Sequence, residues 1–155
     1  SRFVHFEFFR LLSDHEGLGK KGDLMALEVN MRPSGGFTPD MINFARETDV
    51  YKIWADMVAY DSTQKPVGTH HFCAFAGLRD GKDFALTPDD IIEKYDDHLK
   101  MVERIPDALA DAMGNQMYLA TFDTEEELHT FFADVTRQKE PDVSVASEAA
   151  EMVES

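Results

Sequence analysis

The sequence has little of three features that define broad classes of protein. Cys73 is the only cysteine in 155 residues, so no disulfide can form within the chain, and we expect a reducing, cytoplasmic setting. No apolar run is long enough to cross a bilayer as a helix. Basic residues number 15 against 30 acidic ones. The resulting net charge of −15 repels phosphates, so neither nucleic acid nor an anionic membrane is expected as a partner.

The chain does contain enough apolar side chains, 43% of its residues, to build a core. Hydrophobic periodicity and turn residues predict an α+β fold with an antiparallel sheet and covering helices. Three regions are expected: a first region over 1–62, a smaller α/β region over 63–139 and a disordered acidic tail over 140–155. The expected elements of the first region are strands over 2–10 and 24–32, and helical spacing from a Thr38 N-cap with Pro39 to Tyr60, interrupted near Thr48.

The second region reads as mixed strands and helices. Thr124 and Glu127 form a capping-box pattern ahead of a final helix. The other expected elements are a strand over 70–78, a return strand through Phe84 and Leu86 after the Asp80-Gly81 turn, a helix from Thr87 through Ile105, a short helix through Met113 that stops at Gly114, and a strand over 116–122.

Polar side chains gather on one face of the second predicted strand. Because side chains alternate along a strand, Glu28, Asn30 and Arg32 share a face, opposite Leu27, Val29 and Met31. Glu7 stands among phenylalanines on the first strand. Carboxylate and carboxamide oxygens are hard ligands of the kind that magnesium takes, usually together with nucleotide phosphates. These residues therefore predict a magnesium site.

The motif Glu28-Val29-Asn30-Met31-Arg32, with Glu7 upstream, resembles the metal-binding end of the ATP-grasp superfamily. The likeness is closest to the branch of biotin carboxylase and the carbamoyl phosphate synthetase large chain, and Arg32-Pro33 is also similar to ATP-grasp enzymes of purine synthesis. The resemblance implies that Glu28 bridges two Mg²⁺ ions, with Mn²⁺ as an alternative, on the phosphates of ATP. It further implies that Glu7 and Asn30 each bind one ion and that Arg32 holds the anionic substrate or transferred phosphoryl group. Separately from the resemblance, Gly35 and Gly36 form either a substrate- or nucleotide-contacting loop ahead of the helix N-terminus or a plain flexible turn.

The resemblance also implies a reaction. ATP would phosphorylate a carboxylate or bicarbonate, and an amine-type nucleophile would then displace phosphate from the acyl phosphate. Such chemistry depends on positioning and charge neutralisation more than on acid–base groups. The chain starts inside a strand almost at once after Ser1, so we expect a C-terminal fragment of a longer ligase that is inactive alone. A homodimer is compatible with the sequence, which does not set the oligomeric state.

Two other functions remain open. The acidic cluster could serve a Mg²⁺- or Mn²⁺-dependent hydrolase, given a further carboxylate or histidine near Glu28, or the chain could be a non-catalytic acidic interaction module. Among the remaining candidates, His5 shares a face with Glu7 and is expected to be a packed strand histidine. His70 and His71 are adjacent and cannot bind one ion from a strand. Cys73 is expected to act as a small hydrophobic residue.

Overall fold

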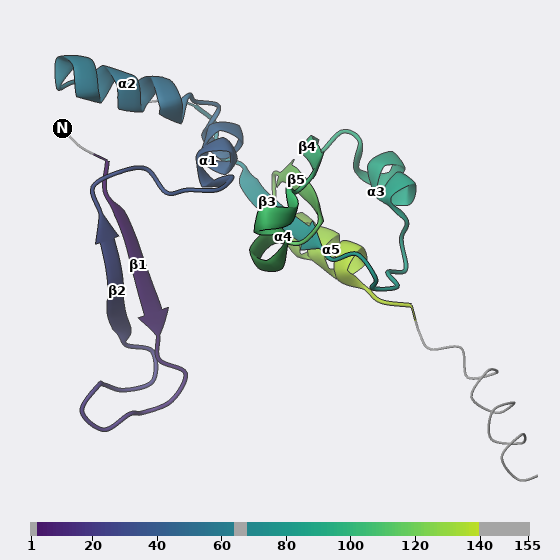
Figure 1. Cartoon of the computed structure of the whole chain (residues 1–155), viewed down its shortest axis with the longest axis horizontal. Helices are drawn as coiled ribbons and strands as arrows, with labels where there is room; N and C mark the ends of the chain where they lie inside the picture. Colours follow the sequence, from purple (N-terminus) through teal and green to yellow (C-terminus); the bar gives the residue numbers. More distant parts are fainter. Residues whose placement is uncertain (1–2, 64–67, 140–155) are drawn as a thin grey trace, which may run out of the picture. The chain divides into compact units, whose positions relative to one another are not determined.

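The computed structural model describes residues 3–63 and 68–139, shown in Figure 1. The chain divides into two compact units, Ser1–Cys73 and Ala74–Ser155, which are described separately below. In the described residues the fold is α+β, as the sequence predicts, with two antiparallel sheets and five helices. No helix in these residues has the length and apolar character that a membrane crossing requires.

The first unit is built on a β-hairpin. Strand β1 (His5–Arg10) pairs with β2 (Leu24–Asn30) in antiparallel register, and the long connection between them lies beyond the paired ends in Figure 1. Backbone hydrogen bonds from Leu11 to Asp23 and from Gly22 to Leu11 extend the ladder into that connection. The predicted strands over 2–10 and 24–32 are confirmed, with shorter bounds.

Two helices follow the hairpin. Helix α1 (Thr38–Arg46) ends at Glu47, whose backbone is left-handed, and α2 (Val50–Tyr60) begins after an Asp49 N-cap. The predicted interruption near Thr48 is therefore confirmed. The predicted Thr38 N-cap is wrong: Thr38 is already the first helical residue, Phe37 precedes it, and no side chain caps the helix. Pro39 in the first turn lacks an N–H that the helix could not have bonded in any case.

The second unit packs helices on a three-stranded sheet. Strand β5 (Gln116–Phe122) lies between β3 (Phe72–Leu78) and β4 (Leu99–Arg104). Every residue of β5 from Met117 to Phe122 is buried, so this strand is the centre of the core. The helices of the unit are α3 (Pro88–Tyr95), α4 (Asp107–Met113) and α5 (Glu125–Thr136).

Helix ends in this unit follow the sequence closely. Thr87 and Thr124 each form a capping box, and α4 stops at Gly114 as predicted. Gly114 has a φ of +88° that side-chain-bearing residues avoid. A Cβ on Gly77 of β3 would lie 1.9 Å from the Met113 carbonyl oxygen. Glycine at Gly77 therefore allows the end of α4 to reach the sheet.

Two predicted elements of this unit are wrong. The helix expected from Thr87 through Ile105 ends at Tyr95, and β4 follows. Leu99 and Met101 are half-buried while Lys100 between them is exposed, a two-residue alternation that pairing with β5 exploits. The expected return strand through Phe84 and Leu86 is also absent in the described residues. Phe84 instead forms an isolated bridge with Gln138, after α5.

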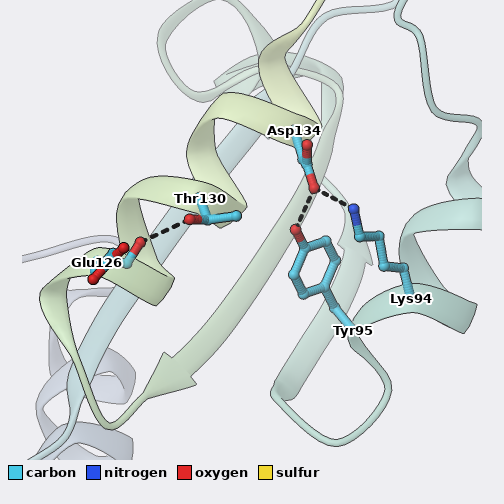
Figure 2. A network of polar contacts seen from close by, with 5 residues as sticks. All are labelled: Lys94, Tyr95, Glu126, Thr130 and Asp134. Carbon is cyan, nitrogen blue, oxygen red and sulfur yellow. Dashed lines mark hydrogen bonds and ion pairs between the residues drawn. The ribbon is translucent and has the colours of Figure 1, made fainter.

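A polar contact joins α3 to α5 (Figure 2). The Lys94 ammonium and the Tyr95 hydroxyl both donate to Asp134 Oδ2, the latter at 2.7 Å. The two hydrogen bonds, with Lys94 contributing more, lower the pKa of Asp134, and burial with the neighbouring carboxylate raises the pKa of Tyr95. The Tyr95 ring also meets Phe131 edge-on at 5.0 Å between centroids. The contact therefore fixes α5 to α3 over an aromatic core.

We expect Asp134→Ala to destabilise the second unit by about 1–2 kcal/mol at pH 7, because the half-buried Tyr95 hydroxyl loses its acceptor. The lowered pKa of Asp134 means that its contribution is complete above the usual carboxyl range, near pH 4, and declines as pH falls further. Urea unfolding of the unaltered chain and of Asp134→Ala, at neutral and at acidic pH, measures the difference in free energy of unfolding. Asp97→Asn, at an exposed turn, is the control. A difference that grows in acid would contradict the expectation.

Candidate functional site

The hairpin places the two predicted carboxylates opposite each other. Glu7 of β1 is the direct cross-strand partner of Glu28 of β2. Side chains of directly opposed residues in an antiparallel pair have their Cβ atoms about 4.5–5.5 Å apart and on one face of the ribbon. The long connection between the strands therefore does not separate these two residues.

Asn30 and His5 complete the same patch. The Asn30 amide nitrogen donates to Glu28 Oε1 at 2.6 Å. His5 is the cross-strand partner of Asn30, and its Nε2 lies 3.4 Å from Glu7 Oε1. We call Glu7, Glu28, Asn30 and His5 the hairpin patch. His5 Nδ1 is buried without a hydrogen-bond partner among the described residues.

A β-bulge lies directly beside the hairpin patch. Glu7 pairs with Glu28, but the next residue, Phe8, pairs with Ala26, so Leu27 has no partner of its own. A bulge breaks the strict alternation of faces. The regular strand alternation expected through Leu27 and Val29 is therefore interrupted at this point. Bulges re-aim neighbouring side chains and are frequent beside functional sites.

The two opposed carboxylates of the hairpin patch favour the binding of a cation. Like charges directly across a strand pair destabilise it, and neither Glu7 nor Glu28 forms an ion pair with lysine or arginine in the described residues. Across residues 3–63 and 68–139, no three His, Cys, Asp or Glu side chains gather closely enough to hold a metal ion by themselves. Magnesium is usually held by one or two carboxylates together with substrate phosphates and waters. The oxygen donors of the patch fit that incomplete type of site.

The remaining predicted site residues are not brought into contact with the patch by any hydrogen bond or ion pair in the described residues. The exposed Arg32 guanidinium donates to its neighbour, the Pro33 carbonyl oxygen, at 2.9 Å. Gly36 has a φ of +60°, which favours glycine in the turn before α1. Gly35 has open space where a Cβ would stand. The Arg32 guanidinium is therefore exposed and could bind a ligand, but the loop does not direct it toward the hairpin patch.

Much of the hairpin is apolar and uncovered. A two-stranded hairpin is marginally stable by itself, and contiguous exposed apolar surface marks a face that something else covers. The exposed apolar side chains of β1 and β2 are Phe6, Phe8, Phe9, Leu24, Leu27 and Val29, each more than half exposed.

The histidine and cysteine candidates outside the patch are held by ordinary packing and polar contacts. The His71 ring lies 3.8 Å from a Glu47 carboxylate oxygen, and His70 meets Phe72 edge-on. Burial raises the pKa of the half-buried Cys73 thiol to about 11. The thiol is therefore protonated at neutral pH, which agrees with its predicted role as a small hydrophobic residue.

Sequence reasoning found no site in the second unit, but that unit contains a cavity of about 310 Å³. Tyr118 and Arg104 line it. Tyr118 lies within an apolar strand and Arg104 lies at the end of β4, two residues before Pro106, so neither residue stands in a motif that would have marked it.

No family model matches the sequence, and no curated protein matches it at a significant level.

We expect Mn²⁺, used as a paramagnetic probe in place of Mg²⁺, to bind the hairpin patch weakly, with a Kd in the millimolar range, roughly what two carboxylates without phosphate partners provide. Amide NMR signals of residues 5–7 and 28–30 should broaden first. The double substitution Glu7→Gln and Glu28→Gln should remove this broadening, whereas Glu16→Gln, in the connecting loop, should not. Early broadening elsewhere, with the hairpin unaffected, would contradict a metal site here.

Proposed function

We propose that this chain is the C-terminal part of an ATP-grasp ligase that joins a carboxylate or bicarbonate to an amine-type nucleophile. The observation that carries the proposal is the register of the hairpin, in which Glu7 faces Glu28 and Asn30 contacts Glu28 at 2.6 Å. Motif and geometry thus agree on the same three oxygen-bearing side chains. An ATP-dependent reaction accounts for a site that is short of ligands until phosphates arrive.

Each residue has a distinct role in this proposal. Glu28, between the other two, would bridge two Mg²⁺ or Mn²⁺ ions, while Glu7 and Asn30 would each hold one. When bound, the ions neutralise charge on the phosphates of ATP. Arg32 would bind the anionic substrate or phosphoryl group through its planar guanidinium. The Gly35-Gly36 turn would let backbone approach the ligand ahead of α1.

The reaction balances without a protein nucleophile. A carboxylate oxygen attacks the γ-phosphorus of ATP, the bond to the bridging oxygen breaks, and ADP leaves with that electron pair. The amine nitrogen then attacks the acyl carbon, phosphate departs, and the nitrogen loses its proton. The protein's part is to orient the reactants and balance charge.

The uncovered apolar hairpin supports the view that more protein surrounds this site in the active enzyme. Ligand geometry must be held within about 0.5 Å for catalysis, which a marginal two-stranded ribbon does not achieve alone. Covering side chains such as Phe6 and Phe8, both more than half exposed, would rigidify the strands that carry Glu7 and Glu28.

We expect the 155-residue chain alone to bind Mg-ATP weakly and to turn over nothing, because only one end of the proposed nucleotide site is present. Isothermal titration with Mg-ATP, and with ATP plus a chelator as the control, measures this. Tight binding by the isolated chain would contradict the proposed division of the site.

In the full-length product of the encoding gene, ADP release should require an added carboxylate or bicarbonate. Glu28→Gln should lower the rate by roughly a hundredfold or more, the scale for losing one group that stabilises developing charge. Glu16→Gln is the matched control outside the patch. Metal-dependent hydrolysis that needs no ATP would favour the hydrolase instead. Unchanged function in Glu28→Ala and Asn30→Ala would favour an interaction module.

A further inference from the structure

The second unit contains a cavity that the proposed ligase chemistry does not use. Its volume is about 310 Å³, and it lies among the end of β3, the loop before α3, the start of α3, and parts of β4 and β5. This size is at the lower end of the range for small-molecule sites. The cavity is formed by residues 78–118 alone, so it is independent of the hairpin patch.

Tyr118 is the unusual residue of the cavity wall. Its side chain is fully buried in β5, and its hydroxyl has no hydrogen-bond partner among the described residues. Burial raises the pKa of this phenol, with Asp89 adding to the effect and Arg104 opposing it, so the hydroxyl is a proton donor at neutral pH. A buried donor without an acceptor is costly, and native proteins rarely keep one without a reason.

Basic residues outnumber acidic ones in the cavity wall, although the protein as a whole is acidic. Three basic and two acidic residues line the cavity, whereas the chain as a whole has a net charge of −15. Arg104 is neutralised by two hydrogen bonds to Asp80, at 2.9 and 2.6 Å. Lys82 is exposed and makes no ion pair with any described residue. Arg79 donates to the Asp111 carbonyl oxygen, and Asp83 adds one negative charge to the wall. With Arg104 and Asp80 paired, the lining has one net positive charge, which favours an anion.

The rest of the wall is apolar, with Leu78, Phe84, Leu86 and Ile91 among its residues. We propose that the cavity binds a small organic carboxylate, whose apolar body lies against these side chains. The Tyr118 hydroxyl has no exposed surface in the unliganded protein, so binding includes a small shift of the side chains that cover it. The hydroxyl then donates a hydrogen bond to one carboxylate oxygen, and Lys82 balances the charge. Inorganic anions would leave the apolar wall unused, and neutral apolar molecules would leave the hydroxyl unsatisfied.

Benzoate is a suitable probe, with the neutral amide benzamide as its matched comparison. In amide NMR titrations of the full chain, benzoate at up to about 20 mM should produce saturable shifts in residues 79–88 and 116–118, since a ligand this small binds weakly. Benzamide should bind more weakly. Lys82→Met should weaken benzoate severalfold and leave benzamide unchanged.

Tyr118→Phe should weaken benzoate about tenfold, the loss of one hydrogen bond to a charged group. Tyr60→Phe, on an exposed part of α2, should have no effect. Tyr118→Phe should also raise the Tm of the unliganded protein by about 5 °C, because the unsatisfied hydroxyl is removed.

Three results would each overturn the proposal. The first is the absence of saturable shifts around the cavity. The second is equal benzoate affinity in Tyr118→Phe. The third is a lower Tm for the unliganded Tyr118→Phe protein, because that would show that the hydroxyl already has a favourable partner.

Discussion

The opposition of two carboxylates across one hairpin is the constraint on which the proposed chemistry depends. Backbone hydrogen bonds fix Glu7 against Glu28, so their mutual repulsion cannot be relieved by sliding the strands without turning apolar side chains to the other face. A bound cation would relieve it. The Asn30 amide already donates to Glu28, and His5 lies beside Glu7. A divalent ion would offset the repulsion between Glu7 and Glu28 more strongly than these contacts do, and it would bind the same oxygens that the sequence motif contains.

The two units differ in how much of a hydrophobic core each one has. In the second unit, β5 is buried over almost its whole length and the Asp134 contact secures α5 against α3. In the first, Pro39 and Val50 are the only fully buried residues among those described. A unit with so little core of its own gains order when other surfaces cover it. The strands with the proposed ligands are therefore the part whose geometry depends most on context.

The sequence predicted best where local chemistry decides structure. The helix start at Thr87, the capping box at Thr124 and the stop at Gly114 depend on adjacent residues, and all three are present. Prediction from the sequence failed where a partner distant in the chain determines the local structure. The β4 segment has enough apolar residues for helical spacing, but pairing with β5 makes it a strand. The pairing of Glu7 with Glu28 was expected from a family resemblance, whereas the bulge at Leu27 depends on register and left no mark in the sequence.

The cavity shows why some sites are invisible to motif analysis. Nothing near Tyr118 in the sequence distinguishes it from a core aromatic residue, since the apolar strand around it is what any buried strand requires. Only the folded surroundings show that its ring is packed while its hydroxyl lacks a partner. A phenylalanine would fill nearly the same volume without that cost. The hydroxyl therefore opposes folding stability in the unliganded protein, and a bound acceptor would turn the same group into a source of stability through mass action.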